Sequence, residues 1–313
     1  MKILHLDKNH DSLINELKKS GYKNVQAYKM PIAEVKSVIS QFDGIVVRSR
    51  FKINSKFLKN GKKIKFIARV GSGIENIDVE YLKKRAIKLI SSPEGNSNAV
   101  GEHAIGLILS LLNKLNLANH SVKNKLWNRE KFRGYEIESK TVGIIGYGNT
   151  GKSLAKKLTG FNVKEIIFYD IIKKTKDSIA RQVSIEELQN KCDILSIHTP
   201  ENKLSIGLIN KTFIERMKRP FWLINTSRGS AVKTKDLIDG IENKKILGAA
   251  LDVLEYEKKS FENTFDNKIN QNFLDLIKNE KIILTPHIAG WTYESHLKLA
   301  KIIVQKIQKD FPV

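Results

Sequence analysis

Short apolar runs alternate with amphipathic segments along most of the chain, and this alternation predicts its secondary structure. A run of four to eight apolar residues is typical of a buried strand, whereas apolar residues three and four apart are typical of a helix. In the first ninety residues the apolar runs predict strands at 2–6, 25–29, 44–49, 65–71 and 87–92. Segments with helical spacing lie between them, at 12–19, 32–40, 55–61 and 78–85.

A second alternating series follows a long apolar segment. Residues 97–118 have a helical pattern that is apolar on most sides, as expected of a helix buried between two domains or two subunits. Beyond it the pattern predicts a last helix at 293–309 and strands at 141–146, 164–170, 193–199, 221–227, 246–254 and 281–287. Alternating strands and helices form parallel sheets with helices on both faces. We therefore expect an α/β protein with two doubly wound parallel-sheet domains.

Three glycines follow the first strand of the second series and open a helix. Gly146, Gly148 and Gly151 have the spacing G-x-G-x-x-G, which alone is a weak signal. Here a strand precedes it and a helix follows, and this context is typical of a dinucleotide-binding unit. The glycines allow a tight turn, a close backbone approach to the pyrophosphate and close packing of helix on strand. A purely structural strand–turn–helix is the alternative.

The residue at the end of the next strand bears on the choice of dinucleotide. Asp170 lies nineteen residues after the last glycine, where a carboxylate would accept hydrogen bonds from the adenosine ribose and repel a 2′-phosphate. This position predicts NAD rather than NADP. Lys173 and Lys174 follow closely and leave NADP as an alternative.

Charged or titratable residues occupy three strand ends of the second series. Arg228 follows one strand, Asp252, Glu255 and Glu257 follow the next, and His287 ends the last. Ligands of doubly wound sheets bind at the carboxyl ends of strands. Arginine matches a carboxylate with a planar fork, and histidine titrates near neutrality, where a neighbouring carboxylate favours its protonated form. A histidine here is otherwise a core residue or a metal ligand, but no second His or Cys has ligand spacing, so we predict no metal site.

These motifs together resemble the D-isomer-specific 2-hydroxyacid dehydrogenase family. The stretches that carry the resemblance occur in order along almost the whole chain: VRS, VGSGIENID, GNSNAVGEHA, SKTVGIIGYG, HTP, INTSRG, ALDVLE and TPHIAG. The resemblance implies a flavodoxin-like substrate domain of residues 1–95 plus 288–313 and a Rossmann NAD domain of residues 96–287. It also implies an NAD-dependent oxidoreductase that transfers a hydride between nicotinamide and a D-2-hydroxy acid.

The resemblance assigns roles to the residues at the strand ends. Arg228 is expected to bind the substrate carboxylate and carbonyl, His287 to act as acid and base, and Glu257 to hydrogen-bond His287. Glu257 is preferred to Glu255 because its offsets from Asp252 and Arg228 match the family pattern.

A further set of residues is expected beside the cofactor. These are Gly146, Gly148, Asn149, Thr150, Gly151, Asp170, His198, Thr199, Pro200, Thr226 and Asp252. Asp252 is expected on the nicotinamide side, with a capping role as the alternative. Glu102 and His103, on the long helix, are expected at an interface rather than in the chemistry.

The first domain contains the residues that bear on the substrate. Arg48 and Arg69 fall at strand ends where family members that act on phosphoglycerate carry arginines, and two guanidinium groups suit a phosphate better than the methyl group of lactate. Ser72 and Gly73 resemble the substrate clamp of the family, and Trp291 stands where a small residue is frequent. We expect 3-phosphoglycerate and 3-phosphohydroxypyruvate, and hence serine biosynthesis. A glyoxylate, hydroxypyruvate or D-lactate type of enzyme is the alternative, with the arginines as surface ion-pair partners.

Three features depart from the family pattern or limit the expected function. The usual proline after Glu257 is missing, and the segment 258–279 is longer than is common. No regulatory domain is expected after Val313. A non-enzymatic NAD-sensing regulator is the less favoured alternative from another class of protein.

The net charge of +22 raises the question of a nucleic-acid partner. Only ten of the 55 basic residues are arginine, and the lysines are scattered among many Asn and Ile residues, as an AT-rich genome would encode them. We therefore expect no nucleic-acid partner, and attraction of a small anionic 2-hydroxy or 2-oxo acid is the alternative meaning of the charge.

Other features of the composition favour a cytoplasmic protein, and the resemblance to the family and the long apolar helix imply a homodimer. Cys192 is the single cysteine, so no intramolecular disulfide can form. The N-terminus lacks the apolar stretch of a signal peptide, and the longest apolar stretch, 104–112, is about half of what a bilayer requires. We expect no membrane partner.

Overall fold

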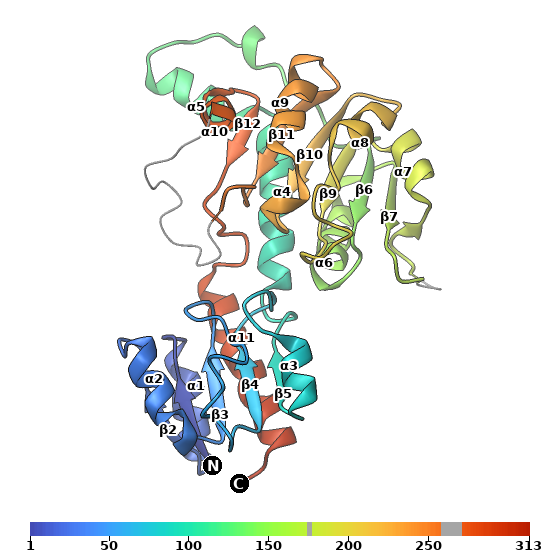
Figure 1. The fold of residues 1–313 in the computed structure, drawn as a ribbon. Helices are drawn as coiled ribbons and strands as arrows, with labels where there is room; N and C mark the ends of the chain where they lie inside the picture. Colours follow the sequence, from blue (N-terminus) through green and yellow to red (C-terminus); the bar gives the residue numbers. More distant parts are fainter. Residues whose placement is uncertain (174–176, 258–270) are drawn as a thin grey trace. The chain divides into compact units, whose positions relative to one another are not determined.

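The computed structural model, which describes residues 1–173, 177–257 and 271–313, divides into two compact units (Figure 1). Of the described residues, unit 1 contains 1–96 and 291–313, and unit 2 contains the rest of the chain between them. The boundaries expected after residues 95 and 287 lie one and three residues before the observed ones at 96 and 290.

Unit 1 is built on a five-stranded parallel sheet with the order β2-β1-β3-β4-β5. Its strands are β1 (Lys2–His5), β2 (Lys23–Gln26), β3 (Gly44–Val47), β4 (Phe66–Arg69) and β5 (Lys88–Ser91). This is the flavodoxin-like order. The fold class expected for the substrate domain is therefore confirmed.

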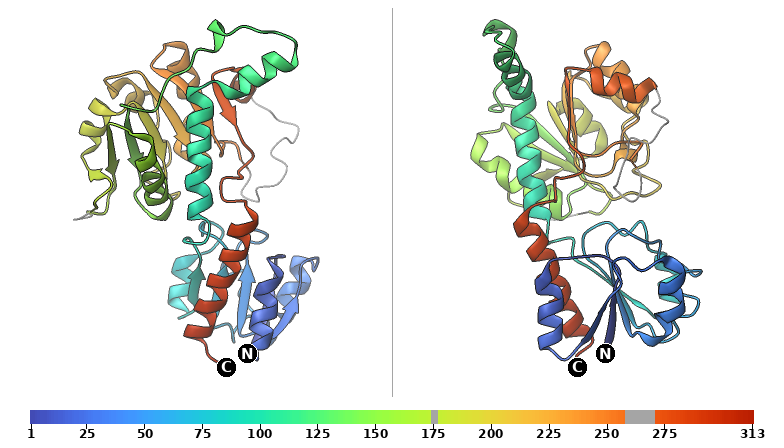
Figure 2. Two further views of the ribbon diagram at one scale, coloured as in Figure 1. Left: turned by 180° about the vertical axis from the view of Figure 1, so that it is seen from behind. Right: turned by 90° about the vertical axis from the view of Figure 1, so that its left-hand side faces the viewer.

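Helices cover both faces of this sheet (Figure 2). The helices are α1 (Asp11–Lys19) and α11 (Tyr293–Asp310) on one face, and α2 (Ile32–Val38) and α3 (Val79–Lys84) on the other, with the short 3-10 helix η1 (Ile39–Gln41) after α2. Successive strand residues point to opposite faces, so Ile3 packs with α1 and α11 whereas Leu4 packs with α2 and α3. The last helix of the chain thus completes the core that the first ninety residues begin.

Unit 2 is built on a seven-stranded sheet with the order β12-β11-β10-β9-β6-β7-β8. Its strands are β6 (Thr141–Ile145), β7 (Glu165–Tyr169), β8 (Arg181–Gln182), β9 (Ile194–Ile197), β10 (Phe221–Asn225), β11 (Ile246–Leu251) and β12 (Ile282–Leu284). Counted from β6, the order is 3-2-1-4-5-6-7, which is the Rossmann order with one further strand. The expected Rossmann fold is confirmed.

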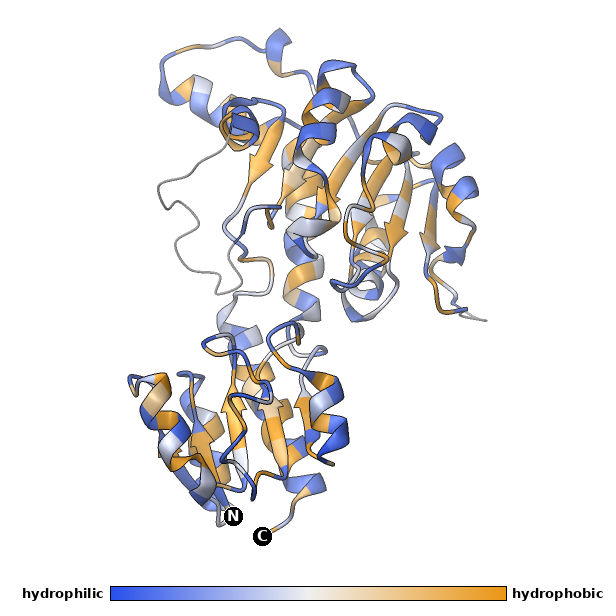
Figure 3. Cartoon of the chain, viewed as in Figure 1, coloured by the Kyte–Doolittle hydropathy of each residue, from blue (hydrophilic) through white to orange (hydrophobic). Residues whose placement is uncertain are grey.

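Two layers of helices enclose the sheet of unit 2. One layer contains α4 (Ser97–Leu112) and α6 (Asn149–Leu158), and the other contains α7 (Ile185–Lys191), α8 (Lys211–Arg216), α9 (Thr234–Glu242) and α10 (Gln271–Lys278). The remaining helices are α5 (Leu115–Lys123), η2 (Glu130–Phe132), η3 (Thr159–Phe161) and η4 (Gly229–Ala231). Apolar residues concentrate in the strands and in the inner helix faces (Figure 3). None of the described helices combines the length and the apolar character needed to cross a membrane.

The predictions of two helices are wrong. The segment 55–61 forms turns, because Asn54 caps a single turn through its side chain and carbonyl and the Asn-Gly pair at 60–61 ends it. The helix expected over 97–118 breaks into α4 and α5 at Lys114, whose φ of +52° is left-handed. The two-residue strand β8 was not expected, since it is too short to show a pattern.

Candidate active site

The glycine loop joins β6 to α6 and has the shape of a phosphate cradle. Gly146 has a φ of +91°, and a Cβ there would lie 2.8 Å from the carbonyl group of His198. A Cβ on Gly151 would lie 2.3 Å from the carbonyl oxygen of Gly146, so the close packing of helix on strand requires a glycine. Gly148 caps α6 without a side chain, and nothing lies within 4 Å of the position of its Cβ. The N–H groups of the first helical turn, which contains Asn149 and Thr150, are therefore presented to open space, as a pyrophosphate requires.

Asp170 is fixed beside this loop by two backbone donors. Its Oδ2 accepts a hydrogen bond of 2.8 Å from Tyr147 N, and its Oδ1 accepts one of 2.9 Å from Ile172 N. Ile171 and Ile172 are 67% and 64% exposed, so apolar surface adjoins the carboxylate. Lys173 is also exposed, and Lys174 lies outside the described residues. A carboxylate beside an apolar surface matches the ribose and the adenine of NAD.

Two hydroxyl groups at the ends of neighbouring strands lack a protein partner. The Oγ1 atoms of Thr199, after β9, and Thr226, after β10, are buried and have no hydrogen-bond partner within the described parts of the chain. A buried hydroxyl without a partner is costly, so these groups suit the polar atoms of a bound ligand. Thr199 lies beside the glycine loop, because its backbone nitrogen is 3.0 Å from the position of a Cβ on Gly146. The described residues thus fit a dinucleotide.

His198 is a neutral, buried side chain next to the same loop. Its Nε2 is 2.9 Å from Ser196 Oγ, and burial lowers its pKa to about 4. Pro200 follows on the surface and accepts a hydrogen bond of 2.6 Å from Ser205 Oγ through its carbonyl. The HTP segment therefore contributes backbone and a neutral ring to this edge of the sheet.

His287, Glu257 and Arg228 lie at the carboxyl ends of three adjacent parallel strands, β12, β11 and β10. His287 Nδ1 is 2.5 Å from Glu257 Oε1, and the two side chains are 27% and 15% exposed. Arg228 occupies the turn after β10, where its Nη1 donates to the carbonyl of Ser227 at 2.6 Å. The structure thus pairs the histidine with the carboxylate that sequence reasoning chose.

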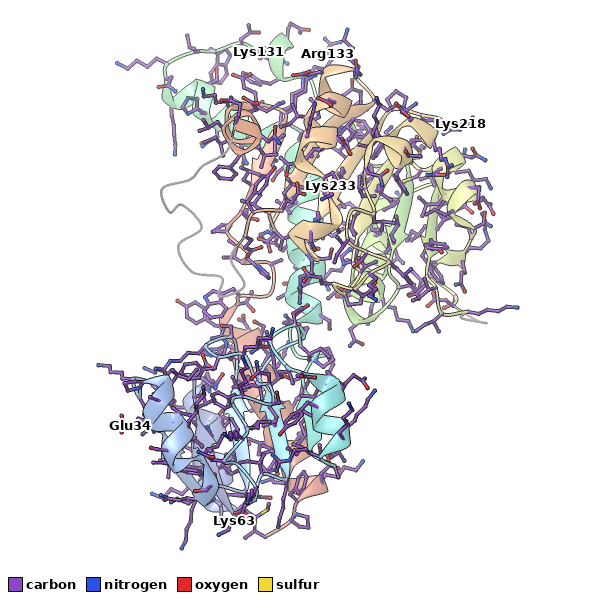
Figure 4. All side chains as sticks on the ribbon, in the orientation of Figure 1. Glu34, Lys63, Lys131, Arg133, Lys218 and Lys233 are labelled. Atoms are coloured by element: carbon purple, nitrogen blue, oxygen red, sulfur yellow. The ribbon has the colours of Figure 1, made fainter. Side chains whose placement is uncertain are left out.

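Glu255, the alternative carboxylate, has different partners. It accepts hydrogen bonds of 2.8 Å from Lys233 Nζ and from Thr234 N, at the beginning of α9 (Lys233 is labelled in Figure 4). Burial opposes the ionisation of Glu255, but the hydrogen bonds from Lys233 and Thr234 prevail and lower its pKa. Glu255 therefore stabilises α9, while Glu257 holds the histidine.

The turn that carries Arg228 is shaped by two residues that sequence reasoning missed. Asn225 is fully buried; its Oδ1 accepts from Ser227 N at 3.0 Å and its Nδ2 donates to the carbonyl of Arg228 at 2.9 Å. A Cβ on Gly229 would lie 1.8 Å from the carbonyl oxygen of Leu254, so the turn packs directly on the backbone that leads to Glu257. An Asn at the end of a buried strand, followed by Ser and Gly, is the signal for such a turn.

Asp252 holds the loop that carries His287. Its carboxylate is 1% exposed and accepts hydrogen bonds from Thr285 Oγ1, Ile288 N and Ala289 N. His103 of α4 also contacts this carboxylate, with Nε2 3.5 Å from Oδ1. The structure thus gives Asp252 a role in supporting this loop and places His103 inside unit 2.

Arg48 and Trp291 come together in unit 1. The Arg48 guanidinium lies 4.4 Å from the centre of the Trp291 ring, and Trp291 is 60% exposed. Burial lowers the pKa of Arg48 and the nearby carboxylate of Asp7 opposes this shift. Among the described residues no acceptor forms a hydrogen bond with the guanidinium. A half-buried guanidinium on an aromatic ring suits an anionic ligand.

Arg69 is held differently, over the glycine-containing loop that follows β4. Its Nη1 donates to the carbonyl of Val70 at 3.0 Å, and a Cβ on Gly71 would lie 1.5 Å from the same atom. Ser72 Oγ donates to Asn96 Oδ1 at 2.8 Å. The backbone N–H groups of Ser72 and Gly73 have no acceptor in the parts of the chain that the structure describes, so they are able to bind an anion.

Comparison with known proteins identifies the family of the chain. Residues 105–289 match the NAD-binding domain of the D-isomer-specific 2-hydroxyacid dehydrogenases. D-3-phosphoglycerate dehydrogenase of Archaeoglobus fulgidus is 33% identical over 310 residues, which are 98% of this chain and 56% of that protein. Hydroxypyruvate reductase of Thermotoga maritima is 32% identical over 280 residues, which are 90% of this chain and 88% of that protein.

A solved structure agrees with these matches. D-lactate dehydrogenase of Aquifex aeolicus, complexed with NAD and lactic acid, has a TM-score of 0.83 and 26% identity, over 99% of this chain and 95% of that one. The chain spans about half the length of the Archaeoglobus relative, at 56%. The glycine loop, the strand ends and these matches together show that the chain belongs to the D-isomer-specific 2-hydroxyacid dehydrogenase family and contains its NAD-binding domain.

Proposed function

We propose that this protein is an NAD-dependent D-2-hydroxyacid dehydrogenase that interconverts a D-2-hydroxy acid and the corresponding 2-oxo acid. The observation that carries the proposal is the pair of His287 Nδ1 and Glu257 Oε1, 2.5 Å apart, at the sheet edge that also carries Arg228 and the glycine loop. When bound, the nicotinamide supplies or accepts the hydride.

The residues of the chain supply binding and proton transfer. The Arg228 guanidinium binds the substrate carboxylate and polarises its carbonyl, as a planar fork can. Glu257 holds the Nδ1 side of the His287 ring, so Nε2 is the atom that exchanges a proton with the substrate oxygen. We also propose Ser72 and Gly73 of unit 1 as substrate-binding residues, because their backbone N–H groups are able to bind an anion.

The two glutamates provide a matched test of this assignment. Glu257→Gln should lower kcat by about 10²-fold, because acid–base catalysis contributes on that order and depends on the orientation of the ring. Glu255→Gln should keep kcat within about 2-fold, since it alters only the start of α9. Steady-state NADH oxidation measures both, and equal kcat losses in the two variants would refute the assignment.

For the substrate we propose 3-phosphohydroxypyruvate and 3-phosphoglycerate, in serine synthesis. Support comes from the Arg48 guanidinium, which lies on Trp291 without a protein acceptor in the described chain, and from the phosphoglycerate dehydrogenase of Archaeoglobus fulgidus. Hydroxypyruvate is the second candidate, because the Thermotoga maritima reductase is nearly as similar, at 32%.

A substrate panel distinguishes the candidates. Phosphohydroxypyruvate, hydroxypyruvate, glyoxylate and pyruvate are compared by kcat/KM with wild type, Arg48→Ala and Arg50→Ala. Arg48→Ala should lower kcat/KM for phosphohydroxypyruvate by about 10-fold or more and should lower kcat/KM for hydroxypyruvate much less. Arg50 is the control because its guanidinium donates to the carbonyls of Ala27 and Met30. Equal effects of Arg48→Ala on both substrates would show that Arg48 does not contact a phosphate.

We further propose that the protein is a homodimer. The segment after α5 exposes Leu126, Trp127 and Tyr135, which are 62%, 80% and 52% accessible. Large apolar side chains this exposed mark an interaction surface. Light scattering should give twice the mass of the chain, and Trp127→Glu should give the mass of one chain. An unchanged mass in the variant would place the interface elsewhere.

A further inference from the structure

The backbone of His287 has a left-handed conformation, which is uncommon for a residue with a side chain. Its φ is +55°, in the left-handed region, which costs an L-residue about 1–2 kcal/mol. The His287 N–H donates to the carbonyls of Asp252 and Thr285 at 2.8 and 3.0 Å. Such a conformation persists only when the surrounding structure holds it.

The carboxylate of Asp252 holds the chain on both sides of His287. On one side, Thr285 Oγ1 donates to Oδ1 at 2.5 Å. On the other side, Ile288 N donates to Oδ1 at 2.9 Å and Ala289 N donates to Oδ2 at 2.8 Å. The position of the His287 ring therefore depends on the position of this buried carboxylate and of the Thr285 hydroxyl.

His103 links this cluster to α4. Its Nε2 lies 3.1 Å from Thr285 Oγ1. The hydroxyl has one proton and donates it to Asp252 Oδ1, in a carboxylate whose two oxygens also accept from Ile288 N and Ala289 N. Nε2 of His103 must therefore carry a proton and donate it to Thr285. The direction of each hydrogen bond in the chain from His103 to Thr285 to Asp252 is thus determined.

α4, which carries the donor His103, is packed tightly against the rest of unit 2. Ala104, Leu107 and Ile108, which follow His103, are buried in the core between α4 and the sheet. On the same side of the helix as Ala104 and Ile108, a Cβ on Gly101 would lie 2.5 Å from Ser153 Oγ of α6, so the two helices are in close contact. The His103 side chain is 22% exposed, and it projects from this packed helix to the end of β12.

We propose that His103 is a positioning residue for His287, which it holds in register with Glu257 through the Thr285 hydroxyl and the Asp252 carboxylate. The catalytic part of this statement rests on the proposed function, in which His287 transfers the proton. The geometric part stands on its own, because it concerns the His287–Glu257 hydrogen bond.

The experiment compares two pairs of variants. His103→Leu and Thr285→Val remove the donor and the relay, whereas His103→Gln keeps an N–H near the position of Nε2 and Thr285→Ser keeps the hydroxyl. We expect His103→Leu and Thr285→Val to lower kcat by about 10–100-fold, as displacement of a reacting group does, with the Kd of NADH within about 2-fold of wild type. His103→Gln and Thr285→Ser should recover most of kcat. Equal activity of the Leu and Gln variants, or a loss confined to NADH affinity, would overturn the proposal.

A proton NMR readout keeps this test independent of the reaction. The short His287–Glu257 contact should give a downfield ring N–H resonance that is absent in His287→Asn and in Glu257→Gln. It should broaden or shift in His103→Leu and remain in His103→Gln. An unchanged resonance in His103→Leu would overturn the proposal even if no substrate were turned over, whereas a lost resonance without turnover in wild type would count against the proposed function alone.

Discussion

The buried imidazole of His198 makes the stability of unit 2 depend on pH in a calculable way. Burial lowers the pKa of His198 from 6.5 to about 4, so the folded ring stays neutral at pH values where the unfolded chain binds a proton. The contribution of His198 to stability is therefore complete above the unfolded pKa and is lost as the pH falls toward 4. Each pH unit between the unfolded and the folded pKa corresponds to about 1.36 kcal/mol, so the loss between pH 7 and pH 4 is about 3 kcal/mol.

His198→Asn removes this pH-dependent contribution. Urea unfolding, followed by circular dichroism, gives the free energy of unfolding of wild type and variant at pH 7 and at pH 4. The difference between the two proteins should be about 3 kcal/mol smaller at pH 4 than at pH 7. Ser196→Ala is the matched control, since it deletes the partner of Nε2, costs about 1 kcal/mol and leaves the imidazole in place. The free energy of unfolding of Ser196→Ala should differ from that of wild type by the same amount at both pH values. If the curves of wild type and His198→Asn run parallel, the folded ring is protonated or solvated, and the reasoning is refuted.

Three further predictions follow from burial and close packing. In unit 1, burial lowers the pKa of His5 to about 4, so the difference in free energy of unfolding between wild type and His5→Asn should decrease by a similar amount from pH 7 to pH 4. An unchanged difference in urea unfolding would contradict this. Gly151→Ala should lower the stability by about 1–3 kcal/mol and weaken NADH binding, because its Cβ would lie 2.3 Å from a carbonyl oxygen. Gly160→Ala is the control, because nothing lies within 4 Å of the position of a Cβ on Gly160. Thermal unfolding measures the stability of both variants, and fluorescence titration measures their NADH binding. Cys192, whose pKa burial raises to about 12, should resist iodoacetamide until the protein unfolds, as mass spectrometry would show.

Both sheets could be predicted from the sequence because each buried strand is a local apolar run. The strand ends followed from the same runs, and the resemblance to the family then selected Arg228, Glu257 and His287 among the residues at those ends. For the strands the signal lies within about ten residues of chain, which is the range over which hydrophobic periodicity acts.

The parts that escaped prediction depend on contacts between distant segments. His103 meets Thr285 across 182 residues, and nothing in the pattern of α4 distinguishes this histidine from one at an interface. The break at Lys114 needs a left-handed residue that the apolar pattern does not reveal. The pattern predicts a helix over 55–61 instead of turns, because a capped single turn and the start of a helix have the same local sequence.

The docking of α11 on unit 1 determines when each unit can fold during synthesis. Leu299, Ile303 and Ile307 complete a core that begins with Ile3, and Tyr22 Oη donates to the carbonyl of Phe311 at 2.6 Å. The first 96 residues of unit 1 are made before unit 2, but the last core residues of unit 1 follow some two hundred residues later, after the described residues of unit 2. On the ribosome unit 2 can therefore reach its native state while the sheet of unit 1 still exposes one apolar face, so the part that is synthesised first is the part that most needs protection from aggregation.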